Sequence, residues 1–177
     1  LPITKLHAIV EEVNQVPLNL GNPATKLNRM FSQADEWMTK YYSLIKRCGI
    51  ECDYVPSEAN SAPEESTEPL RIDEISEAID DADSDLSIDL GAVIKMREIL
   101  EIAQNWIDRV DAVAPKKDSR KKGKQEKHYM HEISDLIDES PAIIVDITDE
   151  LERLKLEQST TMSWRLQAQQ SLRGIVS

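Results

Sequence analysis

Apolar residues recur at spacings of three and four along most of the chain, the period of an α-helix with one buried face. The first such stretch carries Leu6, Ile9, Val10 and Val13 and stops at Pro17, since proline has no amide proton to donate. The second begins at Asn22-Pro23, an N-cap followed by proline at the first helical position. It predicts a helix from about residue 23 to 47.

The same period returns in the rest of the chain, with turn residues between the stretches. A helix is predicted from 71 to 82, and a longer one carries the apolar positions between Val93 and Val113 and ends at Pro115. A helix of about ten residues includes Met130 and ends at Ser140-Pro141. The last pattern runs from Ile144 to Leu172 and predicts a helix of more than about thirty residues.

These patterns predict an all-α fold of five or six helices. Aromatic residues make up 5% of the chain and only five glycines occur, while the periodic stretches are rich in helix-forming residues. Long helices that recur along the chain favour an elongated antiparallel bundle, a spectrin-like or solenoid-like rod. We expect 1–177 to be one helical domain excised from a larger protein, because Leu1 already lies inside an apolar pattern.

Charge changes this picture only locally. The net charge is -12, but residues 51 to 90 hold fourteen Asp or Glu against the single Arg71. Within that stretch, 51–70 combines prolines, serines and glutamates and is predicted to be an acidic flexible loop. Residues 115–127 are rich in lysine and arginine and are predicted to be a basic flexible loop. No membrane span or signal peptide is expected.

One helical pattern occurs more than once. A shift of 69 residues places the 23–47 helix on the helix that ends at Pro115, so that Trp37 falls on Trp106 and Ala34 on Ala103. A further shift of 58 brings Trp164 into the same frame, with a partial match because Thr161 interrupts the apolar face. The core positions predicted from this repeat are Leu27, Phe31, Ala34, Trp37, Met96, Leu100, Ala103, Trp106, Leu154 and Trp164.

Two interpretations of the tryptophans follow. In the first, each indole fills the joint between neighbouring helices, burying on the order of 150 to 250 Å² and finding one partner for its N–H. In the second, one of the three is an exposed anchor for a partner protein, since tryptophan is enriched at binding hot spots. Repetition at equivalent positions favours the first.

The order of these segments resembles a known family. Leu6-His7-Ala8-Ile9-Val10, Asn14-Gln15-Val16-Pro17-Leu18 and Gln33-Ala34-Asp35 look like the opening of the PLU-like helical region of the JARID-type, or Jumonji, histone lysine demethylases. Leu86-Ser87-Ile88-Asp89-Leu90 resembles the lead-in to that region's second tryptophan helix. Ile137-Asp138-Glu139-Ser140-Pro141 is similar to the start of its third. The acidic loop, the basic loop and the break at Thr161 depart from the family pattern and suggest a divergent, fungal member.

The resemblance implies a role without chemistry of its own. It implies a nuclear parent protein with an upstream Jumonji domain that uses Fe(II) and 2-oxoglutarate on histone H3, or an inactive relative of such a protein, flanked by zinc-binding readers. The chain itself is then expected to be a spacer and interaction module for subunits of a chromatin-modifying complex. No cofactor and no small-molecule substrate are expected here.

The residues offer little for catalysis or metal binding. Cys48 and Cys52 lack a second pair of zinc ligands, and His128 and His131 fit the surface of a helix better than a metal site. The aspartates between Asp80 and Asp85 lack the glycine and closing glutamate of a calcium loop. No nucleophile and base pair can be assembled, so we expect no enzyme in this chain.

Two surface patches remain as interaction candidates. A partner face is predicted on the acidic helix at Asp73, Glu74, Glu77, Asp80 and Asp81. A DNA-backbone or nuclear-localisation patch is predicted at Lys116, Lys117, Arg120, Lys121, Lys122 and Lys124. A nucleosomal DNA contact through the basic loop is therefore the alternative function, and a spectrin-like cytoskeletal repeat is a third.

Overall fold

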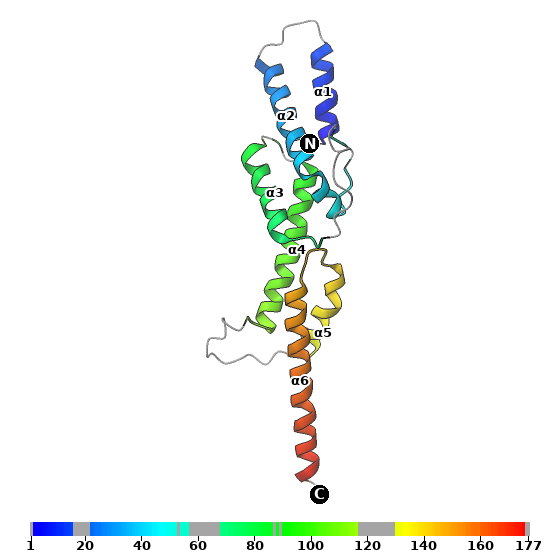
Figure 1. The fold of residues 1–177 in the computed structure, drawn as a ribbon, viewed down its shortest axis with the longest axis vertical. Coiled ribbons are helices and arrows are strands. Elements are labelled where there is room, and N and C mark those ends of the chain that lie inside the picture. Colours follow the sequence, from blue (N-terminus) through cyan, green and yellow to red (C-terminus); the bar gives the residue numbers. More distant parts are fainter. Residues whose placement is uncertain are drawn as a thin grey trace. The chain divides into compact units, whose positions relative to one another are not determined.

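A computed structural model describes residues 2–15, 22–52, 54–56, 68–86, 88, 90–116 and 130–175 of the chain. Every regular element in these ranges is helical, which confirms the all-α fold (Figure 1). The chain divides into two compact units, Leu1–Glu101 and Ile102–Ser177, where the sequence pattern predicts one domain. The boundary falls inside one helix.

The first unit opens with a pair of helices. Helix α1 (Ile3–Gln15) packs along the first half of α2 (Asn22–Arg47), and the two lie side by side in Figure 1. At the end of α2, Gly49 takes a φ of 67° and the Ile50 amide donates to the Ile45 carbonyl at 3.2 Å. This is a glycine-terminated Schellman end, and the helix stops where the sequence predicts.

Helix α3 (Ile72–Asp85) follows, packed against α2, and α4 (Gly91–Val113) begins in this unit and ends in the second. Helix α3 is one turn longer than predicted from its apolar residues, because aspartates and a serine continue it as far as Asp85. The buried side chains of α3 are Ile75, Ala78, Ile79 and Ala82. This spacing lies on one face of the helix, so α3 is amphipathic, with its opposite face exposed.

The ends of the acidic segment 51–70 are anchored in this unit. Tyr54 donates to Asp35 at 2.5 Å, and its ring lies within 6.2 Å of the rings of Phe31 and His7. At the other end Leu70 is buried. The two described ends of the predicted acidic loop are thus packed against this unit, and residues 57–67 lie outside the described ranges.

The second unit contains the end of α4, α5 (Met130–Glu139), a 3-10 turn η3 (Ser140–Ala142) and α6 (Thr148–Ile175). Helix α5 packs along the first part of α6. The prediction that the last helix exceeds thirty residues is wrong, since α6 has 28 and starts at Thr148. Asp146 accepts from the Thr148 amide at 3.1 Å and its hydroxyl at 2.7 Å, so the helix begins there, after Ile144.

Candidate interaction sites

Two indoles are buried in matching contacts, which we call tryptophan joints. In the first, Trp37 on α2 is 4% exposed and its Nε1–H donates to the Ala78 carbonyl of α3 at 2.9 Å. In the second, Trp106 on α4 is 2% exposed and donates to the Leu136 carbonyl of α5 at 3.1 Å. Each indole therefore has the single partner that the first interpretation predicts for a buried N–H.

Each joint also has an ion pair. Its cation lies three residues after the tryptophan, and its carboxylate lies three residues after the residue whose carbonyl accepts from the indole. Lys40, three residues after Trp37, contacts Asp81 at 2.6 Å, and Asp81 lies three residues after Ala78. In the second joint Arg109 holds Glu139 with two hydrogen bonds, at 2.6 and 3.0 Å. The two joints thus share an indole, a carbonyl, a cation and a carboxylate in one arrangement.

The ion pairs shift the ionisation of their members. The hydrogen bond from Lys40, joined by one from the Tyr41 hydroxyl, lowers the pKa of Asp81. The hydrogen bonds from Arg109 lower the pKa of Glu139 in the same way. All four charged side chains of the two pairs are more than a third exposed, so we expect each pair to specify the position of the short helix more than to stabilise it.

The short helices that cover the indoles are themselves repeats. A shift of 58 residues places Glu74-Ile75-Ser76 of α3 on Glu132-Ile133-Ser134 of α5, and Ile79-Asp80 on Ile137-Asp138. The same shift places Ala78 on Leu136 and Trp106 on Trp164. Helices α3 and α4 therefore form a short-plus-long pair that α5 and α6 repeat in one unbroken register.

Sequence reasoning missed the ion pairs, although the signal was present. The shift of 69 that superposes Trp37 on Trp106 also superposes Lys40 on Arg109, a cation on a cation. A repeat defined by apolar positions alone does not include this match, because Lys40 and Arg109 are polar. The acidic partners sit in the short helices, which follow a different shift because the connections before α3 and α5 differ in length.

Trp164 departs from the prediction that it is a core residue. Its side chain is 69% exposed, and Leu172, two turns later, is 65% exposed. The first part of α6 is packed against α5, where Leu154 is fully buried, but no short helix among the described residues covers the part that begins at Trp164. An indole becomes core only when another element lies over it, and the apolar pattern of α6 alone does not determine that.

The other predicted core residues lie as follows. Ala34, Met96, Ala103 and Leu154 are fully or nearly fully buried, and Leu27, Phe31 and Leu100 are half-buried on the flanks of their helices.

The predicted acidic partner face is divided by the structure. Asp81 belongs to the first joint, and Glu74 accepts from Arg47 at 3.0 Å and from the Arg71 amide at 3.2 Å. Burial acts to raise the pKa of Glu74, but these bonds outweigh it and lower the pKa. The other three members of the predicted face, Asp73, Glu77 and Asp80, are exposed and accessible to a partner.

The predicted basic patch is mostly outside the described ranges. Lys116 is exposed at the end of the segment that follows α4. The remaining members, Lys117, Arg120, Lys121, Lys122 and Lys124, lie among residues 117–129, which the structure does not describe. The DNA interpretation therefore stays a prediction.

The metal and calcium candidates do not come together in the described ranges. No group of three or more His, Cys, Asp or Glu there is arranged to hold a metal ion. Asp80 to Asp85 lie on helix α3 and not in a loop. Cys48 is buried, which raises the pKa of its thiol to about 11, and His128 lies outside the described residues.

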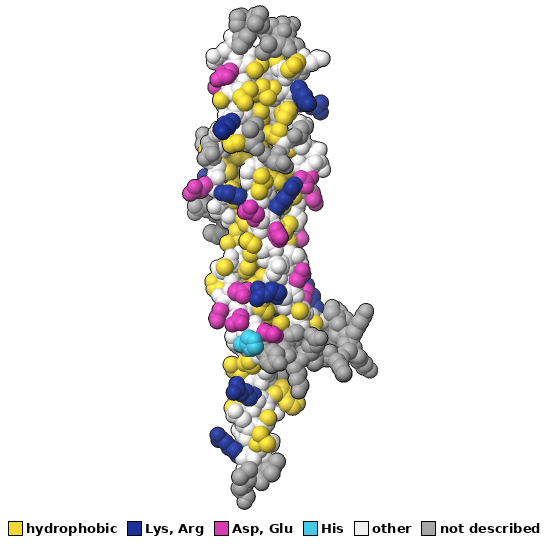
Figure 2. Space-filling model, turned by 180° about the vertical axis from the view of Figure 1, so that it is seen from behind, with side chains coloured by type: hydrophobic (Ala, Val, Ile, Leu, Met, Phe, Trp, Pro, Cys, Tyr) yellow, Lys and Arg dark blue, Asp and Glu magenta, His cyan; other side chains and the backbone are white. Residues whose placement is uncertain are grey.

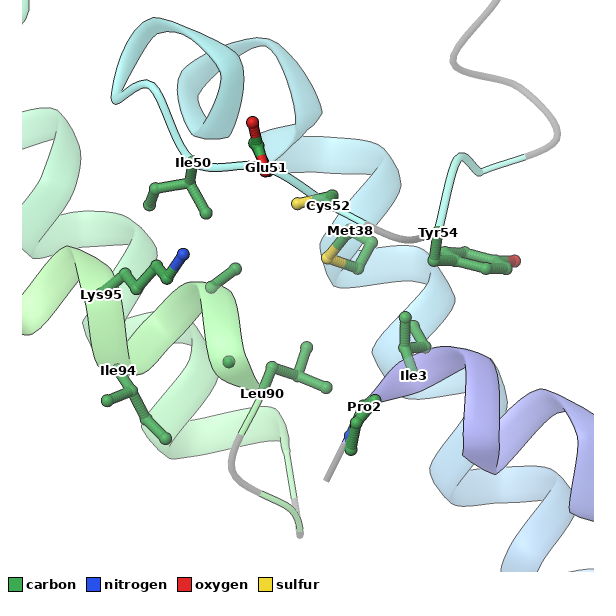
Figure 3. Close-up of a pocket in the computed structure, with 12 residues that line it drawn as sticks. Pro2, Ile3, Met38, Ile50, Glu51, Cys52, Tyr54, Leu90, Ile94 and Lys95 are labelled. Carbon is green, nitrogen blue, oxygen red and sulfur yellow. The ribbon is translucent and has the colours of Figure 1, made fainter.

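One open pocket of about 240 Å³ lies in the first unit. Figure 3 shows Ile3, Met38 and Leu90 on its apolar wall, with Glu51 and Lys95 at its edge. Pockets that enclose drug-sized ligands typically measure about 300 to 1,000 Å³. The pocket is thus below that range and carries few polar groups to orient a ligand.

Comparison with known protein families, with curated proteins and with solved structures finds no match to this chain. In the described ranges no helix combines the length and the apolar character that crossing a bilayer requires.

Proposed function

We propose that this chain is a helical spacer and protein-interaction module of a chromatin-modifying protein. The observation that carries the proposal is the repeated tryptophan joint, in which Trp37 and Trp106 fix successive short helices by the same set of contacts. Buried indoles and paired charges of this kind support an architectural role, because each indole N–H and each charge finds its partner on the neighbouring helix.

Helix length supports the spacing part of the proposal. At about 1.5 Å per residue, α2 with 26 residues extends about 39 Å and α6 with 28 extends about 42 Å. Helices of this length present long faces on which other proteins can dock in the groove-and-ridge mode of helix packing.

The chromatin context rests on the resemblance to the PLU-like region of the JARID-type demethylases. In that setting the parent protein carries the Fe(II) and 2-oxoglutarate chemistry, and this chain works in the nucleus as a non-catalytic part of a transcription-regulating complex. The exposed acidic residues Asp73, Glu77 and Asp80 on α3 are the proposed docking face for a basic surface of a complex subunit.

An affinity capture from nuclear extract tests the proposal. We expect the wild-type chain to recover subunits of a chromatin-modifying complex, and the D73N/E77Q/D80N variant to lose them, since it removes three exposed charges and leaves Glu74 and Asp81 in place. The matched control is E98Q/E101Q/D108N, which removes three exposed charges from α4. Recovery of free histones alone, or of cytoskeletal proteins, would contradict the proposal.

A further inference from the structure

The face of α6 that begins at Trp164 has the composition of a tryptophan joint without its cover. In α2, Trp37 and the residue eight positions later, Ile45, are both buried, and so are Trp106 of α4 and Ala114, which directly follows that helix. The corresponding residues of α6, Trp164 and Leu172, are 69% and 65% exposed. We call Trp164, Ala168 and Leu172 the open socket.

The two internal joints show what covers such a face. In both, the cover is a short acidic helix that presents a main-chain carbonyl to the indole and a carboxylate three residues later. The open socket carries matching charge, since α6 has Arg165 and Arg173 and no Asp or Glu between residues 160 and 175. On the face seen in Figure 2, this end of α6 shows hydrophobic and basic side chains and no acidic ones.

Helix α1 has the form of such a cover. A shift of 69 residues, the one that relates α2 to α4, places Ile3, Leu6 and Val10 of α1 on Ile72, Ile75 and Ile79 of α3. Leu6 and Ile75 are both nearly fully buried, and Val10 and Ile79 are each 7% exposed. Among the described residues, α1, α3 and α5 are therefore short helices in one register, each followed by a long helix.

The face of α1 that would meet an indole is uncovered. In this register Ile9 corresponds to Ala78 and Leu136, the two residues whose carbonyls accept from the indoles, and both of those are buried. Ile9 is 44% exposed instead. Glu12, three residues later and also exposed, corresponds to the carboxylates Asp81 and Glu139. We call Ile9, Glu12 and Val13 the open plug.

From these two faces we propose that copies of this chain associate head to tail, with α1 of one copy seated on the open socket of the next. The Trp164 Nε1–H of one copy donates to the Ile9 carbonyl of the other, and Leu172 covers the apolar plug. The contact repeats the two joints already present within the chain, and the acidic plug meets the basic socket. Because socket and plug are different surfaces, the association is heterologous.

This inference goes beyond the proposed chromatin function and concerns only the chain itself. The association is weaker than an internal joint for two reasons. The two copies are not covalently linked, so the effective concentration of the partner helix is lower than within one chain. In addition, Gln167 stands three residues after Trp164, where the internal joints have Lys40 and Arg109.

Sedimentation of the purified chain tests the proposal without any chromatin partner, so its failure and that of the proposed function are separable. We expect the average mass to rise with concentration up to about 1 mM, the range of a weak single-joint contact. W164A, which removes the socket, and I9D, which places a charge in the plug, should each stay monomeric.

Matched controls separate the joint from general surface hydrophobicity. L166A changes an α6 side chain that is 59% exposed on another face, and I144D places a charge at a residue 48% exposed. Both should associate as the wild type does. Helical circular dichroism of every variant verifies that folding is unchanged, as expected for exposed positions.

Mixing the two blocked variants gives the sharpest result. W164A keeps the plug and I9D keeps the socket, so an equimolar mixture should form a dimer and no larger species. Adding Q167R to the I9D partner restores the joint cation opposite Glu12 and should tighten that dimer about two- to fivefold, the effect of one exposed ion pair. Monomers at every concentration would overturn the proposal, as would association that survives both W164A and I9D.

Discussion

Replacing each tryptophan by alanine should separate the two buried indoles from the exposed one. Trp37 and Trp106 are 4% and 2% exposed, so each variant removes nearly a whole buried indole and its hydrogen bond. Trp164 is 69% exposed and its loss removes little buried area. The three substitutions are chemically identical, and therefore only the surroundings differ.

The magnitude follows from the buried area. A buried tryptophan contributes about 150 to 250 Å², which at about 25 cal/mol per Å² corresponds to about 4 to 6 kcal/mol as an upper bound. Measured losses for large-to-small core substitutions of this residue are about 3 to 5 kcal/mol. We expect W37A and W106A to lower the free energy of unfolding by that amount, and W164A by less than about 0.5 kcal/mol.

Urea unfolding followed by circular dichroism at 222 nm measures these values, at a protein concentration low enough to exclude association. The phenylalanine variants W37F and W106F separate the hydrogen bond from the ring, with an expected loss of about 0.5 to 1.5 kcal/mol for the missing indole hydrogen bond. A cost for W164A equal to that for W37A would refute the reasoning. So would an unchanged urea midpoint for W106A.

Three further predictions use charge and ionisation. Burial raises the pKa of the Cys48 thiol to about 11, and burial together with the hydrogen bond to Asp35 raises the pKa of the Tyr54 hydroxyl to about 12. The stability that these two groups contribute is present below their unfolded pKa values of about 9 and 10 and is lost as pH rises through their folded values. The C48A/Y54F variant should therefore flatten the fall of the urea midpoint in alkali. The pKa of Glu139 is lowered, so the stability that Glu139 contributes is present above about pH 4.5 and is lost in acid. The R109Q variant should lower the free energy of unfolding by about 0.2 to 1 kcal/mol at pH 7 and weaken its dependence on acid pH. Urea midpoints at several pH values measure both effects. The alternative function predicts that the chain binds nucleosomal DNA in a gel shift at low salt, and that binding disappears when six basic residues are replaced by glutamine. Binding that persists in this variant would contradict the alternative function. The six residues are Lys116, Lys117, Arg120, Lys121, Lys122 and Lys124.

The helices were predictable because their signals are local. The end of α2 was readable from Gly49, and the end of the short α5 from Ser140-Pro141. The apolar pattern predicts too early a start for α6, because Ile144 and Ile147 continue it, whereas the Asp146 carboxylate accepts from the Thr148 amide and hydroxyl where the helix begins. Here a local polar contact overrides hydrophobic periodicity.

The exposure of Trp164 was not predictable from periodicity, since burial belongs to a pair of elements and not to one. Trp37, Trp106 and Trp164 share a register, but their covers are separate segments whose connections differ in length. Recognising the covers requires comparing the short helices with one another, which an analysis of tryptophan helices alone omits. The ion pairs Lys40–Asp81 and Arg109–Glu139 become visible in sequence only after that second comparison.

The joint connects neighbouring pairs of helices, and this determines how the chain builds stability. Trp37 belongs to the pair α1–α2 but is satisfied by α3, and Trp106 belongs to α3–α4 but is satisfied by α5. Each pair therefore completes its core only when the next short helix is in place, as expected for repeats stabilised through nearest neighbours. Ile9 on α1 and Trp164 on α6 hold the corresponding positions of the repeat but have no such neighbouring helix among the described residues, which accounts for their exposure of 44% and 69%.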